Sequence, residues 1–110
     1  MKVDFDMVEF FVALVAEECQ KRAFSGVYGF PRGGLPLAVW ISHRAKLPML
    51  MSPYKGALLV DDIADTGATL SRYKDTNFIA TMFYHRQSLV KPDLWVYEKT
   101  NEWIVFPWEA

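Results

Sequence analysis

The 110-residue sequence lacks the features of secreted, membrane-bound and nucleic-acid-binding proteins. It has one cysteine, Cys19, so it can form neither an intrachain disulfide nor a zinc site of the CxxC kind. Its 12 Lys and Arg residues against 13 Asp and Glu give a formal net charge of -1. Because there is also no polybasic run, general binding to a phosphate backbone is excluded. The apolar stretch 10–16 is too short to cross a bilayer. We therefore expect a cytoplasmic protein with no nucleic-acid or membrane partner.

Signs of a boundary inside the chain are missing as well. There are no internal repeats, no Gly/Ser-rich or Pro-rich linkers and no blocks of like charge. Hydrophobic residues make up 52% of the chain and aromatic residues 15%, which is enough to build a buried core. Residues 1–110 are therefore predicted to form a single domain.

Hydrophobic periodicity and turn residues predict alternating helices and strands. The helices are expected at 6–23, with Asp4 or Asp6 as the cap, from Leu35 with Pro36 in the first turn, and briefly at Leu70–Lys74. The strands are expected at Gly26–Phe30, Leu47–Met51, Ala57–Val60, Phe78–Phe83 and Leu94–Tyr97. This order predicts an α/β fold with a mostly parallel sheet flanked by helices, and a ligand at the carboxyl ends of the strands. The glycine-containing loops 31–34 and 61–69 should face the same crevice.

The segment LLVDDIADTGATL, residues 58–70, carries the most chemical information. An apolar strand delivers Asp61 and Asp62 to its end, and the loop ADTGAT then turns into a helix. Backbone N–H groups and threonine hydroxyls in such a turn suit a phosphate monoester. The two carboxylates would repel a phosphate, but they can accept hydrogen bonds from sugar hydroxyls and stabilise a nearby positive charge. The combination indicates a phosphorylated sugar.

This segment closely resembles the phosphoribosyl diphosphate (PRPP) motif of type I phosphoribosyltransferases, and most of all that of their 6-oxopurine branch, which includes the hypoxanthine and xanthine-guanine enzymes. GFPRGG, 29–34, resembles the pyrophosphate loop of the same branch, and WIVFPWE, 103–109, resembles its ending. The three motifs stand in the family order and span nearly the whole chain. The resemblance implies a phosphoribosyltransferase fold with a minimal hood.

The resemblance also implies a role for each acid of the motif. Asp61 and Asp62 match the residues that bind the ribose hydroxyls and Mg²⁺, and their charge would stabilise an oxocarbenium-like transition state. Asp65 matches the general acid/base that handles the proton on purine N7. The implied reaction transfers ribose 5-phosphate from Mg²⁺-PRPP to a purine base, with a 6-oxopurine favoured, and releases pyrophosphate.

Two loops are implied to bind the phosphates of PRPP. The 5′-phosphate loop comprises Asp65, Thr66, Gly67, Ala68 and Thr69. Arg32 and Gly33 match the pyrophosphate loop, where a cation and exposed amides would neutralise the leaving group. The resemblance leaves open whether the Pro31-Arg32 peptide is cis or trans.

The base-binding residues depart from the family pattern. Trp103 matches the aromatic residue that stacks on the purine, although it could equally be a core or interface residue. A lysine reads the 6-oxo group in the family, whereas this chain has His85 or Arg86 at that place, either in the pocket or in a solvated loop. Both side chains can donate to a carbonyl oxygen.

The loop that closes over PRPP in most relatives is reduced here to the turn SPYKG, 52–56. Exclusion of water would then need another source, such as the partner in a homodimer. Two alternatives stay open. One is a weak or inactive PRPP- or nucleotide-binding regulatory protein of the same fold, and the other is a structural or partner-binding remnant that does not bind PRPP.

Overall fold

The computed structural model describes residues 1–109. Its elements are, in chain order, α1 (Phe5–Lys21), β1 (Val27–Gly29), α2 (Gly34–Ala45), β2 (Leu58–Ala64), the 3-10 helix η1 (Leu70–Tyr73), β3 (Phe78–Tyr84), β4 (Leu94–Glu98) and the 3-10 helix η2 (Pro107–Glu109). Among these residues no helix has both the length and the apolar character needed to cross a membrane.

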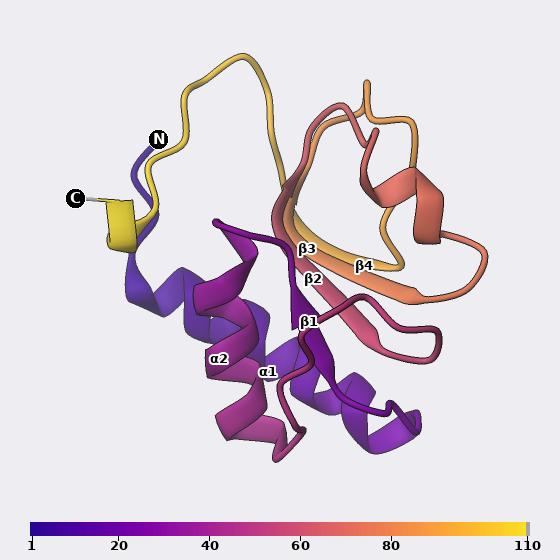
Figure 1. Ribbon diagram of the computed structural model, residues 1–110. Helices are drawn as coiled ribbons and strands as arrows, with labels where there is room; N and C mark the ends of the chain where they lie inside the picture. The colour runs from indigo at the N-terminus through magenta and orange to yellow at the C-terminus, as the bar shows by residue number, and fades with distance from the viewer. Residues whose placement is uncertain (110) are drawn as a thin grey trace.

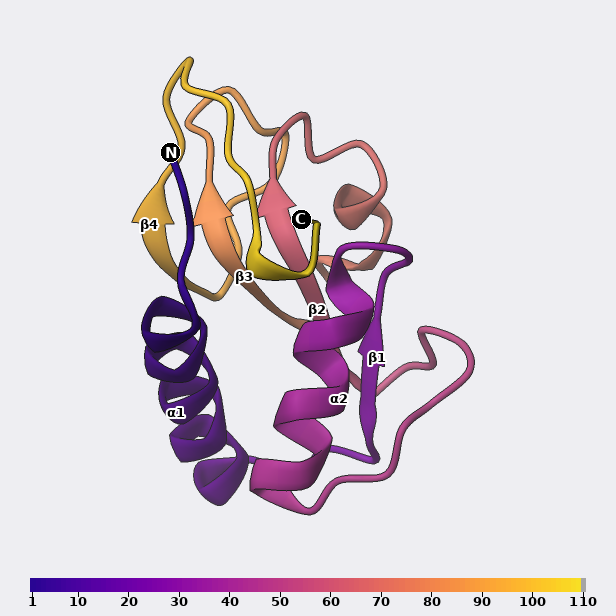
Figure 2. The ribbon, with the colours of Figure 1, turned by 90° about the vertical axis from the view of Figure 1, so that its left-hand side faces the viewer.

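The strands form one four-stranded sheet in the order β1-β2-β3-β4, and every neighbouring pair is parallel. Helices α1 and α2 lie side by side on one face of this sheet, while η1 lies on the other (Figures 1 and 2). The predicted α/β fold with a parallel sheet flanked by helices is confirmed. Because all four strands point the same way, the loops that follow them gather at one edge.

Helix α1 forms where the apolar periodicity predicts it. The side chain of Asp4 caps the helix by accepting a hydrogen bond from the N–H of Met7 at 2.9 Å. Its inward face buries four apolar side chains: Val8, Phe11, Val12 and Val15. Helix α2 begins at Gly34, which places Pro36 in the first turn, as expected, where its missing N–H costs nothing.

The predicted strand Leu47–Met51 is wrong. Only an isolated parallel bridge joins Met49 to Val27 at the free edge of β1. Pro48 supplies its carbonyl to Val27 at 2.9 Å, but it has no N–H to donate, and Pro53 follows closely. A ladder at this edge therefore stops after one bridge.

Strand β2 is longer than predicted. The strand expected at Ala57–Val60 continues to Ala64, because β3 provides partners for Asp61, Ile63 and Ala64. Asp61 and Asp62 thus lie on the strand itself and not in the loop after it. The strand fixes these two side chains, which favours a preorganised site.

The sheet separates two apolar clusters. The larger lies between the sheet and the helices and includes Leu58 and Val60, whereas Leu59 belongs to the smaller cluster under η1. This alternation follows from the two-residue period of a strand. The core therefore holds both faces of β2 and positions its carboxyl end.

Candidate active site

Three cavities adjoin one another at the carboxyl edge of the sheet, and residues 61–65 of β2 and its loop form walls of all three. Asp65 lies between the smallest cavity and the one under Trp103, while Asp62 lies between the latter and the one beside Arg32. The sequence-predicted acids are thus at the centre of a continuous concave surface. An extended ligand with several polar groups fits such an arrangement.

The smallest cavity, of about 150 Å³, is enclosed by the loop that follows β2. It is lined by Asp61, Ile63, Ala64, Asp65, Thr66, Gly67, Ala68, Thr69 and Leu70. Gly67 has a φ of 76°, and a Cβ there would lie 2.3 Å from Ser88 Oγ. Only glycine satisfies both the positive φ and this close approach.

Several backbone N–H groups of this loop make no hydrogen bond within residues 1–109. The N–H of Ala68 bonds to Thr66 Oγ1 at 3.3 Å, whereas in residues 1–109 the N–H groups of Thr66, Gly67 and Thr69 have no acceptor. Free amides around a small polar cavity form an anion-binding site. The loop can therefore hold a phosphate group.

Asp61 and Asp62 occupy opposite faces of the end of β2. Asp61 lines the small cavity, whereas Asp62 lines the two larger ones. Burial and the neighbouring charge of Asp62 raise the pKa of Asp61 to about 8. A hydrogen-bond donor or a cation that reached this pair would relieve the repulsion between its two carboxylates.

The largest of the three cavities, of about 660 Å³, lies between the β1–α2 loop and the end of the chain. It is lined by Arg32, Gly33, Pro36, Asp62, Trp108 and Glu109. The Pro31-Arg32 peptide is cis. A Cβ on Gly33 would lie 2.0 Å from Asp62 Oδ2, so the loop can approach β2 only because this residue is glycine. The cation of Arg32 gives the cavity a group that can pair with an anion.

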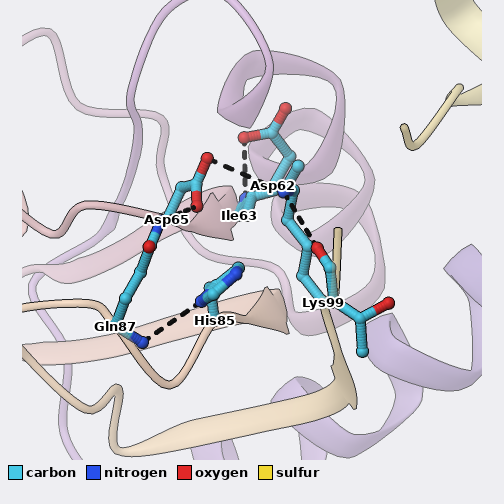
Figure 3. A network of polar contacts seen from close by, with 7 residues as sticks. Asp62, Ile63, Asp65, His85, Gln87 and Lys99 are labelled. Carbon is cyan, nitrogen blue, oxygen red and sulfur yellow. Dashed lines mark hydrogen bonds and ion pairs between the residues drawn. The ribbon is translucent and has the colours of Figure 1, made fainter. Parts of the chain in front are cut away.

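The third cavity, of about 230 Å³, lies under residues 99–109. It is lined by Asp62, Ile63, Asp65, Lys99, Trp103, Ile104, Phe106 and Glu109. Asp65 accepts a hydrogen bond from Gln87 Nε2 at 3.1 Å, and Lys99 Nζ lies 3.9 Å from its other oxygen (Figure 3). Trp103 is 80% exposed, so its indole is available to a ligand. A flat heterocycle with polar edges fits these surroundings.

His85 and Arg86 are placed differently. The backbone N–H of Gln87 donates to His85 Nδ1 at 3.1 Å, which puts the proton of a neutral ring on Nε2. His85 itself follows β3, and its N–H bonds to Ala64. It lies near Asp65 and Gln87 (Figure 3) but lines none of the three cavities. Arg86 turns away and pairs with Glu98 at 2.6 Å on the surface. The structure therefore brings His85, but not Arg86, close to the other predicted site residues.

Sequence reasoning missed two side chains that contact Asp65. Lys99 directly follows β4 at the same edge of the sheet as the motif. The rule that ligands bind at the carboxyl ends of parallel strands could have identified it. Gln87 lies in an irregular loop, and no sequence signal marks it.

Among residues 1–109, no three His, Cys, Asp or Glu side chains form a cluster that could enclose a metal ion. Asp61 and Asp62 supply only a pair of carboxylates. Mg²⁺ is commonly held by one or two carboxylates together with substrate phosphates and water. The residues therefore fit Mg²⁺ that arrives with a phosphorylated ligand.

The chain is similar in structure to several proteins of known structure. No protein-family model matches the chain, and no curated protein matches it. A purine phosphoribosyltransferase from Pyrococcus horikoshii superposes with a TM-score of 0.83 at 26% identity, over 100% of this chain and 94% of that one. The xanthine-guanine-hypoxanthine phosphoribosyltransferase of Helicobacter pylori gives 0.76 at 17% identity, over 99% and 93%. The hypoxanthine phosphoribosyltransferase of Trypanosoma cruzi, in complex with IMP, gives 0.66 at 13% identity, over 89% and 76%.

These likenesses agree with the motifs read from the sequence. The parallel sheet, the loop after β2 and the segment 99–109 all fall within the superposed length of the Pyrococcus structure. The chain therefore has the phosphoribosyltransferase fold and resembles, over its whole length, the purine phosphoribosyltransferase of Pyrococcus horikoshii.

Proposed function

We propose that the protein transfers ribose 5-phosphate from Mg²⁺-PRPP to a 6-oxopurine and releases pyrophosphate. The observation that carries this proposal is the set of three adjoining cavities, with Asp62 and Asp65 in the walls between them. PRPP has one phosphate, a sugar and a diphosphate, and the acceptor is a flat base. The printed name of the Pyrococcus structure, a purine phosphoribosyltransferase, supports the same activity.

Each part of PRPP can then be assigned to particular residues. The 5′-phosphate binds to the free amides of the loop at 66–69, and the diphosphate binds beside Arg32 and Gly33. Asp61 and Asp62 accept hydrogen bonds from the ribose hydroxyls. Mg²⁺, when bound with PRPP, neutralises part of the diphosphate charge and helps it to leave.

The reaction proceeds through positive charge at the sugar. As the bond from C1′ to the diphosphate breaks, the carboxylate of Asp62 stabilises the oxocarbenium character, and Asp61 adds to this once its carboxyl is ionised in the complex. Purine N9 attacks C1′, and Asp65 takes the proton from N7 as the glycosidic bond forms. Trp103 stacks on the base and holds it against Asp65.

Lys99 selects the base in this account. Lys99 is mostly buried, with 17% of its side chain exposed, and it lines the same cavity as Trp103 and Asp65. An ammonium group only donates hydrogen bonds, so it suits the 6-oxo group of a purine and not the 6-amino group of adenine.

This account predicts a preference among bases. Pyrophosphate release from Mg²⁺-PRPP should be measured with hypoxanthine, guanine, xanthine, adenine, uracil and orotate. The best 6-oxopurine should exceed adenine in kcat/KM by about 10- to 100-fold, the value of one hydrogen bond to a charged group. Equal rates with adenine would contradict the selection by Lys99.

The variant Lys99→Met provides the second arm of this assay. It should lower kcat/KM for the 6-oxopurine by about 10- to 100-fold and leave adenine little changed, because a thioether cannot donate to the oxo group. Lys91→Met is the matched control, since Lys91 is exposed and lies outside the three cavities. A similar loss in both variants would assign the effect to net charge.

We also propose that the protein acts as a cytoplasmic homodimer. Several large apolar side chains are exposed, including Phe5, Phe10 and Met51 at 56%, 54% and 89%, and association would cover some of them. Sedimentation at micromolar concentration should give twice the chain mass of 12.7 kDa. A species of the chain mass at all concentrations would contradict the dimer.

One observation favours a second candidate, a PRPP- or nucleotide-binding regulatory protein without turnover. Only a short turn, closed by a bond from Ala57 N–H to Tyr54 O at 3.1 Å, precedes β2, so no long loop covers the site. Binding needs no such cover, whereas an oxocarbenium-like centre needs protection from water. Thermal stabilisation by Mg²⁺-PRPP without pyrophosphate release would support this candidate.

A further inference from the structure

The segment that carries Trp103 has few attachments of its own. Residues 100–105 belong to neither a helix nor a strand. Within residues 1–109, the backbone hydrogen bonds that join them to another segment go to residues 1–3. The N–H of Val105 donates to the carbonyl of Met1 at 2.9 Å, and the N–H of Val3 donates to the carbonyl of Val105 at 2.9 Å. Residues 1–3 therefore anchor residues 103–105 through backbone hydrogen bonds.

The two segments also share the core. Val3, Ile104 and Phe106 are all buried in the cluster under α1 and α2. The indole of Trp103 lies outside this cluster and is 80% exposed. Both ribbon views show the N-terminal residues running alongside the C-terminal segment (Figures 1 and 2). The position of Trp103 thus depends on a neighbour that is distant in sequence.

We propose that residues 1–3, here called the N-terminal strap, position the base-binding half of the site. The inference rests on the proposed function, because it takes Trp103 as the residue that stacks on the purine. The strap fixes residues 103–105 by a parallel bridge between Lys2 and Val105. Trp103 is then held over the cavity that Asp65 and Lys99 line.

The phosphate-binding half does not use the strap. The small cavity is built from residues 61–70, which β3 and the contact from Leu89 N–H to Thr66 O at 2.8 Å hold in place. Loosening the strap should therefore weaken binding of the base more than binding of PRPP, because the 5′-phosphate site lies apart from the strapped segment, although Trp108 and Glu109 of the diphosphate cavity follow that segment. A general loss of stability would affect both.

The variant Val105→Pro tests this separation, because proline has no N–H to donate to Met1. Val105→Thr is the matched control, since it keeps the N–H and the branched shape at a partly exposed position. The KM for the 6-oxopurine should rise about tenfold in Val105→Pro, as expected for one lost hydrogen bond. The KM for PRPP should stay within about twofold of the control. Equal changes in both KM values, or none, would overturn the strap.

Hydrogen exchange keeps the test independent of turnover and of the folding of the variant. In the wild-type chain, amides of residues 3 and 105 should be protected together, and added IMP should slow both further. Exchange of residues 1–5 at the rate of an unfolded peptide would overturn the proposal. If the wild type turns over no purine, the proposed function fails. The exchange of the free protein then still decides whether residues 1–3 hold residues 103–105.

Discussion

Replacing Asp65 by Asn should lower the kcat of purine transfer by about 10²- to 10⁴-fold, the usual contribution of a general acid/base. The amide keeps an oxygen that can accept the hydrogen bond from Gln87, which now bonds at 3.1 Å. It cannot take the proton from purine N7. The loss should therefore appear in kcat, which steady-state pyrophosphate release measures.

The binding of PRPP provides the internal control for Asp65→Asn. Thermal stabilisation by Mg²⁺-PRPP should be nearly unchanged, because in the proposed complex the backbone amides of the loop, and not the Asp65 side chain, would hold the 5′-phosphate. Asp75→Asn is the matched variant, since Asp75 is exposed and lies outside the three cavities. A kcat in Asp65→Asn equal to that of Asp75→Asn would remove Asp65 from the chemistry.

Replacing Asp61 by Asn should stabilise the free protein increasingly as the pH rises from about 4 to about 8, and it should abolish most of its activity. Burial and the charge of Asp62 raise the pKa of Asp61 from 3.8 to about 8. The folded protein therefore binds a proton that the unfolded chain releases between these values. Its stability must fall as the pH rises from about 4 to about 8. The amide has no charge, so Asp61→Asn lacks this loss.

The difference between the two proteins is the measurable quantity. Chemical unfolding at pH 4 and pH 8 should show Asp61→Asn gaining a few kcal/mol over wild type at the higher pH, because one pKa unit corresponds to about 1.4 kcal/mol. At pH 4 the two should be similar. Asp75→Asn should follow wild type throughout. If the two proteins differ in free energy of unfolding by the same amount at both pH values, burial and Asp62 do not raise the pKa of the Asp61 carboxyl.

The two acids lie in different surroundings. Asp61 destabilises the empty site, whereas Asp65 has partners in Gln87 and Lys99. A strongly raised carboxyl pKa is a common property of functional sites. Substrate hydroxyls and Mg²⁺ would relieve the destabilisation by Asp61, so substrate binding and stability are linked at this pair.

The sheet and the central motif could be predicted from the sequence because their signals are local. The apolar runs at β1 and β2, each followed by a glycine-containing loop, mark the two strands and their direction. The parallel arrangement then follows from the crossover of α2. The same signals place Arg32 and the acids of β2 at one edge of the sheet.

The edge segment at Leu47–Met51 and the length of β2 could not be predicted. A local pattern shows that residues prefer an extended backbone, but not whether a partner strand is present. Met49 has one bridge, at a free edge, whereas Asp61 has a partner in Thr81 of β3. In both segments, the number of pairing partners in the sheet determines how far the strand extends.

The base-binding half of the site depends on contacts between distant segments. Lys99 approaches Asp65 only after β4 has joined the sheet, and Trp103 is held by residues from the other end of the chain. The family resemblance indicates Trp103, but it contains no information on residues 1–3. The structure was needed to connect these parts.

The most direct test of this account is to quantify both products formed by the wild-type chain from Mg²⁺-PRPP and each 6-oxopurine. The account predicts the purine 5′-nucleotide and pyrophosphate in equal amounts, both dependent on Mg²⁺. Stabilisation by PRPP with neither product would contradict transfer and favour the regulatory protein. The absence of both products and of stabilisation would contradict the PRPP site itself.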